Sequence, residues 1–156
     1  MHGNCLHLLE SFYAYLNTIG INPNLHTFNV LIKAFCKLKR FNEAKNLLLV
    51  EMENRGCGPD AVSYGTLMSG LCKEGRVMEA VALLETMILN RCQPDVVCYN
   101  VLIDGLSKSG GCEEAIGVWK RMLEAGCVPN VVSYNSMLNC LYRDSGKFYD
   151  ATKIWH

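Results

Sequence analysis

Long apolar runs and net charge are both missing from this 156-residue chain. No run of 18 apolar residues occurs, so the sequence predicts no membrane-spanning helix. Lys and Arg total 15, as do Asp and Glu, giving a formal net charge of +0. Zero net charge argues against a protein that binds duplex DNA through its phosphates. It does not exclude a protein that binds a single strand through its bases. Half of the residues are hydrophobic and no segment is of low complexity, which predicts a folded chain.

Metal and catalytic motifs are also missing. The nine cysteines include no Cys-x-x-Cys, and the four histidines show no ligand pairing with them. Cys57, Cys92 and Cys127 instead recur at intervals of 35 residues. We therefore expect free cysteines that are buried as small apolar residues in a reducing compartment. No nucleophile–base pair or pair of carboxylates is evident, so the sequence predicts neither an enzyme nor a cofactor.

Proline is scarce, and its positions reveal a repeat. The chain contains only four prolines: Pro23, Pro59, Pro94 and Pro129. They lie 36, 35 and 35 residues apart, and each begins a near-copy of Pro-Asp-Val-Val-Cys-Tyr-Asn-Val-Leu, the version at Pro94. A period of this length predicts a stacked array of repeat units.

The period divides the chain into five segments. We predict the second helix of a truncated unit over 1–24, whole units over 25–60, 61–95 and 96–130, and a truncated unit over 131–156. The first whole unit is one residue longer, and we place its extra residue in the Leu47–Glu51 run. The last segment has one extra residue near Asp144–Ser145. We interpret the chain as a piece of a longer array, and expect self-association because its end units expose faces that stacking normally covers.

Each unit is predicted to contain two helices. In the third whole unit these run over Tyr99–Lys108 and Glu113–Ala125. Thr27, Ser63 and Ser133 precede the first-helix aromatic of their units, and we expect them to be N-caps. The small residues Ala44, Ala80, Ala115 and Ala151 share one phase, where two helices can approach closely. The sequence therefore predicts an all-α, right-handed superhelical solenoid of helix-turn-helix repeats.

Glycines mark the predicted helix ends. Gly20 ends the opening helix, and the first helices end at Gly75, Gly110 and Gly146. The second helices end at Gly56 and Gly126, whereas Arg91 takes that place in the middle unit. We expect the turn at Arg91 to be more strained, because a left-handed conformation suits glycine.

Four motif elements recur in phase with this 35-residue period. They are the Val-Val-x-Tyr-Asn-x-Leu opening, the Leu-Cys-Lys-x-Gly middle, the Glu-Ala step and the Pro-Asp close. Over practically the whole chain they resemble pentatricopeptide repeats of the plain 35-residue class. Tetratricopeptide repeats fit less well, since their period is 34 residues. The resemblance implies binding of single-stranded RNA, one base per repeat. It also implies a plant or other eukaryotic protein of the mitochondrion or chloroplast that stabilises, processes or permits translation of a transcript.

The resemblance also assigns site residues. Two positions per unit, the fifth and the last, face the edge of one base: Asn24, Asn29, Asp60, Gly65, Asp95, Asn100, Asn130 and Asn135. Second residues sandwich the base: His26, Val62, Val97 and Val132. Cations at the ends of the first helices meet the phosphates: Lys37, Lys73, Lys108 and Arg143. The implied RNA is approximately U-(G/U)-C-pyrimidine, read in parallel from its 5′ end.

Other interpretations stay open for these residues. An Asn in a first helical turn can bond the neighbouring turn instead of a base. Gly65 has no side chain, so its unit reads a base only weakly through Asp95. His26 can stack on a base, but it can equally pack against Phe28 or face solvent. Cations at a helix end also suit the helix dipole. The alternative function is a helical scaffold for protein interactions.

Overall fold

The computed structural model describes residues 2–144, with side chains described from Glu10 onward. No strand occurs within residues 2–144. The elements are α1 (His2–Thr18), α2 (Leu25–Lys37), α3 (Phe41–Asn46), η1 (Leu47–Glu51), α4 (Met52–Asn54), α5 (Ala61–Lys73), α6 (Val77–Leu89), α7 (Val96–Lys108), α8 (Cys112–Glu124) and α9 (Val131–Arg143). None of these helices is long and apolar enough to cross a membrane.

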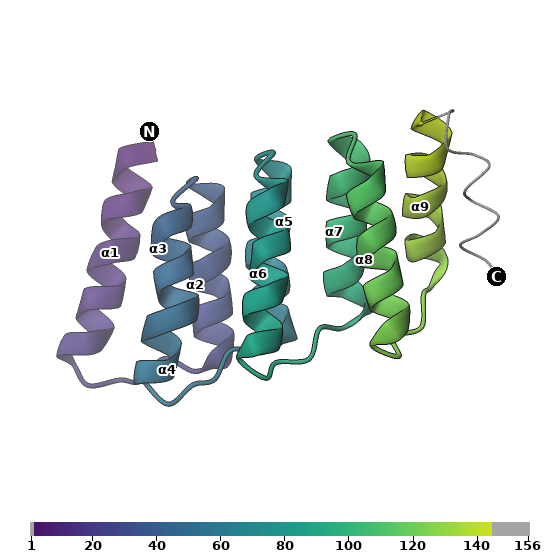
Figure 1. Ribbon diagram of the computed structural model, residues 1–156. Helices are drawn as coiled ribbons and strands as arrows, with labels where there is room; N and C mark the ends of the chain where they lie inside the picture. Colours follow the sequence, from purple (N-terminus) through teal and green to yellow (C-terminus); the bar gives the residue numbers. More distant parts are fainter. Residues whose placement is uncertain (1, 145–156) are drawn as a thin grey trace.

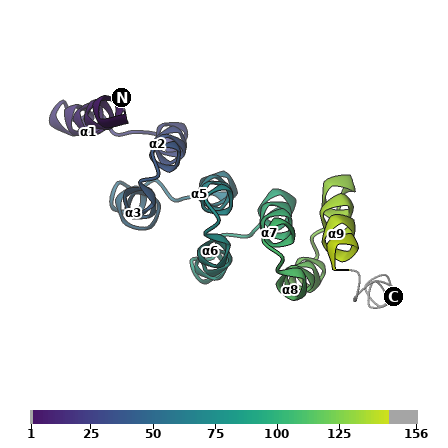
Figure 2. The ribbon, with the colours of Figure 1, turned by 90° about the horizontal axis from the view of Figure 1, so that it is seen from above.

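The helices form two rows along an extended molecule (Figures 1 and 2). The first helices of the units, α2, α5, α7 and α9, stack directly on one another in one row. The second helices α3, α6 and α8 form the other row, each against the first helix of its own unit. This arrangement is the predicted all-α solenoid.

The core is a continuous layer with no centre. Leu31, Leu67, Leu102 and Met137 occupy the same phase of the four first helices, and all are buried. Ala44, Ala80 and Ala115 are fully buried on the second helices, which confirms the predicted close approach; Ala151 lies outside the described residues. Each unit therefore covers its apolar face against its neighbours.

Polar contacts join α1 to the first whole unit. The hydroxyl of Tyr13 donates to Oε2 of Glu51 at 3.0 Å. The guanidinium of Arg55 lies 5.6 Å from the centroid of the Tyr13 ring, and Arg40 pairs with Glu10 at 3.2 Å. Exposed pairs of this kind contribute little individually.

The first helices begin three residues earlier than predicted. Their N-caps are Asn24, Asp60, Asp95 and Asn130, each accepting a hydrogen bond from the backbone N–H of the third helical residue. The N-cap prediction for Thr27, Ser63 and Ser133 is therefore wrong, because these are third helical residues. In a capping box, the N-cap residue and the third helical residue are both of types that favour N-caps. The sequence alone was therefore compatible with a helix starting after either residue.

Glycine turns end the helices as predicted. Gly20, Gly56, Gly75, Gly110 and Gly126 all have positive φ. Arg91 has φ 58 and is in the expected left-handed conformation, which costs a non-glycine residue energy. Lys39 has φ 60 and forms a second such turn, which was not predicted from the sequence. Gly146 lies outside the described residues.

The extra residue of the first whole unit lies where it was predicted. Leu47–Glu51 forms one turn of π-helix inside the second helix of that unit. A π-turn absorbs a single inserted residue without breaking the helix. Leu47 and Leu48 therefore still face the core. Ser145, where a second extra residue was predicted, lies outside the described residues.

Candidate nucleic-acid interface

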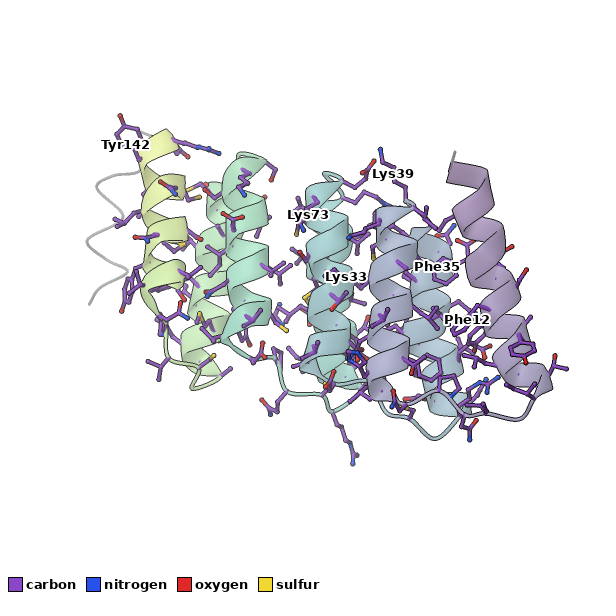
Figure 3. The ribbon with its side chains drawn as sticks, turned by 180° about the vertical axis from the view of Figure 1, so that it is seen from behind. Phe12, Lys33, Phe35, Lys39, Lys73 and Tyr142 are labelled. Carbon is purple, nitrogen blue, oxygen red and sulfur yellow. The ribbon has the colours of Figure 1, made fainter. Side chains whose placement is uncertain are left out.

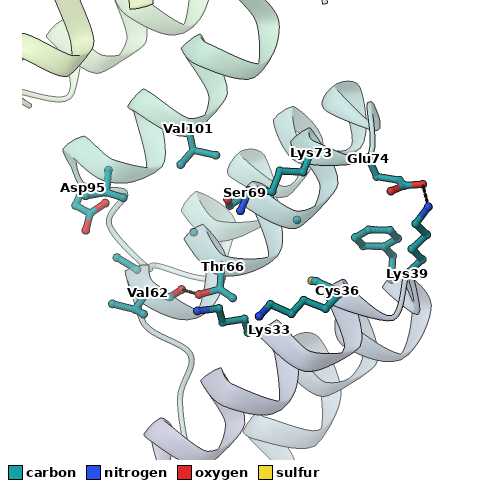
Figure 4. Close-up of a pocket in the computed structure, with 16 residues that line it drawn as sticks. Lys33, Cys36, Lys39, Val62, Thr66, Ser69, Lys73, Glu74, Asp95 and Val101 are labelled. Carbon is teal, nitrogen blue, oxygen red and sulfur yellow. Dashed lines mark hydrogen bonds and ion pairs between the residues drawn. The ribbon is translucent and has the colours of Figure 1, made fainter. Parts of the chain in front are cut away.

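A pocket of about 530 Å³ opens between α2, α5 and α7 (Figure 4). Val62 and Gly65 line it from α5, Val97 lines it from α7, and Asp95 lines it from the N-cap of α7. These are the predicted base-contacting residues of a single unit, 61–95, together with the sandwich residue of the next. The structure thus brings together side chains that are 30 or more residues apart in the sequence.

The predicted sandwich valines are exposed in every unit. Val62, Val97 and Val132 are 58%, 58% and 56% exposed, whereas Val77, at the start of a second helix, is 5% exposed. A lone exposed valine needs no explanation. Three exposed valines at the same position of successive first helices form a regular row of apolar side chains. His26 has the same phase on α2 and is also exposed.

A hydrogen-bond network links the two predicted base-reading residues of the unit 96–130. The backbone N–H of Ser133 donates to Oδ1 of Asn130 at 3.1 Å, and the backbone N–H of Asn130 donates to Oγ of Ser133 at 3.0 Å. Nδ2 of Asn100 donates to Oδ1 of Asn130 at 3.1 Å. The Ser133 hydroxyl in turn donates to Oδ1 of Asn100. Asn100 is only 7% exposed, and its amide bonds the N-terminal cap of the next first helix, not a neighbouring turn of its own helix.

The cap fixes which group the last residue of a unit directs away from the helix. Oδ1 of Asn130 faces N–H and O–H donors, so its amino group points away from the cap. Oδ1 of Asp60 and of Asp95 accepts from the helix in the same way, which leaves each a second carboxylate oxygen. Asn130 therefore offers a donor at the point where Asp60 and Asp95 offer an acceptor.

The fifth residue of a unit pairs with the third residue of the next unit. Oγ of Ser63 donates to Oδ1 of Asn29 at 2.6 Å, as Ser133 does to Asn100. In the middle unit the pair is Gly65 and Cys98, and Sγ of Cys98 contacts the Ala61 carbonyl oxygen at 3.5 Å instead. Asn135 is exposed on α9.

The four predicted cations occupy the last turn of each first helix and are exposed. Their surroundings differ, however. Nζ of Lys108 lies 2.8 Å from Oδ2 of Asp104, one turn earlier on α7. Nη1 of Arg143 donates to the carbonyl oxygen of Ser107 at 3.2 Å. Lys37 and Lys73 line the pocket. The i,i+4 pairing of Asp104 with Lys108 could have been found from the sequence.

The cysteines with described side chains are all free, as predicted. Cys98, Cys112 and Cys140 are buried and the others half-buried. Burial raises the pKa of the Cys36 thiol to about 11, and burial chiefly does the same for Cys72. These thiols are protonated at neutral pH and act as small apolar side chains. Among the described residues, no group of three or more His, Cys, Asp and Glu could hold a metal ion.

Family models match nearly the whole described chain. The PPR repeat family matches residues 23–73, 59–108 and 94–143, and the pentatricopeptide repeat domain matches residues 3–37. A pentatricopeptide repeat-containing protein of Arabidopsis thaliana is 45% identical over 74 residues, covering 47% of this chain and 16% of the relative. A mitochondrial one from the same plant is 33% identical over 105 residues, covering 54% of this chain and 26% of the relative. The chain thus spans a small part of these relatives.

Solved structures share the fold. The pentatricopeptide repeat protein PPR10 in complex with an 18-nucleotide psaJ RNA element has a TM-score of 0.76 and 31% identity, over 89% of this chain and 20% of that one. PPR10 from maize alone has a TM-score of 0.80 and 26% identity, over 98% of this chain and 23% of that one. The PPR domain of Arabidopsis thaliana protein-only RNase P 1 in complex with tRNA has a TM-score of 0.74. Its 16% identity, over 98% of this chain and 79% of that one, indicates the fold alone.

Proposed function

Because this chain belongs to the pentatricopeptide repeat family, we propose that it binds single-stranded RNA, one base per repeat unit. The observation that carries this proposal is the pocket that has Val62 and Val97 in its lining together with Asp95. Two exposed apolar side chains can hold the faces of a base, and a carboxylate between them can accept from its edge. Apolar contact with a base face is tolerant of sequence, so the edge contact supplies the preference.

The caps suggest which base each unit prefers. A carboxylate oxygen accepts from the ring N–H of uracil or guanine, whereas an amide N–H2 donates to the ring nitrogen of cytosine or adenine. We infer U for Asn29 with Asp60, G or U for Gly65 with Asp95, and C before U for Asn100 with Asn130. Asn135 suggests a pyrimidine, so the proposed RNA is approximately U-(G/U)-C-pyrimidine.

The cellular role is proposed from relatives. PPR10 has been solved with an RNA element, and a relative in Arabidopsis thaliana is named mitochondrial. We propose that the chain is part of a mitochondrial or chloroplast factor that stabilises, processes or permits translation of a transcript. We propose no catalytic step for these residues.

Fluorescence anisotropy with a labelled UGCU-containing RNA tests RNA binding. At roughly 1–2 kcal/mol per base, three whole units give about 3–6 kcal/mol, a Kd between roughly tens of micromolar and several millimolar. Val97→Ala should weaken binding about two- to fivefold by removing part of an apolar contact. Val50→Ala is the matched control, since Val50 is 45% exposed in η1 of a second helix.

The competing function is a protein-interaction scaffold. Unlabelled homopolymeric RNAs should displace the labelled RNA, with poly(U) and poly(C) more effective than poly(A). Equal effects of Val97→Ala and Val50→Ala, or no competition by any RNA, would exclude RNA binding at this pocket and leave the protein-interaction scaffold.

A further inference from the structure

The cations along the first-helix row are unevenly neutralised. Lys108 is paired with Asp104 at 2.8 Å, and Lys39 is paired with Glu74 at 3.3 Å. Among the ion pairs between described residues, Lys33, Lys37 and Lys73 have no acidic partner. All three are exposed and line the same pocket. The positive charge therefore gathers around the unit 61–95.

Lys33 reaches this pocket from a neighbouring unit. It lies on α2, and Lys73 lies on α5; the two side chains extend toward the same hollow (Figures 3 and 4). Lys33 precedes Lys37 by one helical turn. Along the axis of α2 it therefore lies about 6 Å nearer the N-terminal ends of the first helices. That end carries the exposed valines Val62 and Val97. An ammonium group there is placed to meet a phosphate next to a base held between the valines.

The residue at the phase of Lys33 changes along the array. It is Ser69 in the second whole unit, Asp104 in the third and Asn139 in the last. None of these three residues carries a positive charge, and Asp104 also pairs with the cation one turn later, Lys108. Since a paired ammonium gains less from a phosphate than an unpaired one, the identity of this residue tunes the backbone contact of each unit.

We propose, resting on the RNA-binding function above, that Lys33 is a phosphate-binding residue and that Asp104 suppresses phosphate binding by Lys108. The RNA backbone is then held mainly at Lys33, Lys37 and Lys73, near the unit 61–95. The unit 96–130 contributes base contacts with little backbone attraction.

Salt dependence of binding separates this proposal from a uniform row of cations. Each phosphate contact on a single strand contributes about 0.7 to the slope of log K against log salt. Lys33→Ala should make this negative slope shallower by about 0.7. The ratio of wild-type affinity to variant affinity should therefore fall about 2.6-fold between 50 and 200 mM KCl. Lys108→Ala should leave the slope unchanged. Lys120→Ala, an exposed lysine on α8, controls for the change in net charge.

A gain of binding completes the test. Asp104→Asn releases Lys108, so affinity for a labelled 8-nucleotide RNA should rise and the slope should increase by about 0.7. The double variant with Lys108→Ala should return to the wild-type value. If Lys33→Ala behaves like Lys120→Ala, or if Lys108→Ala lowers the slope as much as Lys33→Ala, the proposal is wrong although RNA binding stands. If the wild-type chain binds no RNA at 50 mM KCl, both proposals are overturned.

Discussion

The hydroxyl of Ser63 donates a hydrogen bond to Oδ1 of Asn29, 2.6 Å away across the boundary between two units. Ser133 makes the same contact with Asn100. Between these two boundaries, Gly65 faces Cys98, and neither side chain offers the hydroxyl–amide pair. The fifth residue of one unit and the third residue of the next thus vary together. Asn29 and Asn100 occur where the next unit supplies a hydroxyl that orients the amide.

Introducing that pair should sharpen the base preference proposed for the middle unit. A Cβ at Gly65 would lie 3.6 Å from Sγ of Cys98, which is an ordinary contact, so the backbone there accepts a residue other than glycine. We expect Gly65→Asn with Cys98→Ser to give this unit the preference for U that is proposed for Asn29 with Asp60. Affinities for RNAs that differ only at the facing base provide the measurement.

The two single variants serve as controls for this pair. Gly65→Asn alone lacks the hydroxyl, and Cys98→Ser alone has no amide to orient, so each should shift the preference less than the double variant. Additive effects of the two changes would show that the residues are not coupled.

Asn130→Asp should change the preference of the unit 96–130 from C toward U. The cap keeps Oδ1 on the Ser133 N–H, so the change replaces an outward amino group with an outward carboxylate oxygen. We expect a shift of about 1 kcal/mol, roughly fivefold in the C-to-U ratio, near the lower end of base-discrimination energies. Competition between RNAs with C or U at one position measures it.

Asn42→Asp is the matched control, because Asn42 is an exposed residue of α3 in the second-helix row, away from the proposed RNA-contacting residues. Asp is also a good N-cap, so Asn130→Asp should not lower the melting temperature. An unchanged C-to-U ratio with an intact fold would show that Asn130 does not read a base.

Gly105→Ala and Gly117→Ala should have opposite effects on stability. A Cβ at Gly105 would lie 2.7 Å from Sγ and 3.1 Å from Cβ of Cys72, whereas Gly117 has nothing within 4 Å. We expect Gly105→Ala to lower the free energy of unfolding by about 1–3 kcal/mol through overpacking. Gly117→Ala should raise it by about 0.5–1 kcal/mol through helix propensity.

Urea unfolding followed by circular dichroism measures both effects. Adding Cys72→Ala to Gly105→Ala should recover part of the loss, since it removes the nearer of the two contacts. If Gly105→Ala stabilises the chain as Gly117→Ala does, the first helices are not as closely packed as described.

The chain should self-associate through its end helices. Phe12 and Tyr15 on α1 are 53% and 60% exposed, and Leu138 and Tyr142 on α9 are 50% and 79% exposed; Phe12 and Tyr142 lie at opposite ends (Figure 3). Light scattering should give a mass that rises with concentration. Phe12→Ser with Tyr142→Ser should reduce that rise, because both end faces lose an aromatic contact. A constant monomeric mass for the unaltered chain would contradict the expectation.

The sequence by itself determined the features that depend on local backbone preferences. The prolines and glycines set the period and the helix ends, Arg91 marked a left-handed turn without glycine, and the extra residue was placed in Leu47–Glu51, where the structure has a π-turn. These outcomes follow from steric rules that act within a few residues. The N-cap frame was predicted wrongly, because residues three apart, such as Asp60 and Ser63, satisfied the same local rule.

Only the tertiary structure decided which side chains meet between units. Asn100 contacts Asn130 and Ser133, which are 30 or more residues away in the sequence. Gly65 has no side chain and lines a pocket that Lys33 also lines from another helix. The direction in which each amide points depends on donors supplied by the next unit. Local patterns repeat faithfully along this chain, but the contacts between repeats depend on how closely the first helices stack, which is a property of packing.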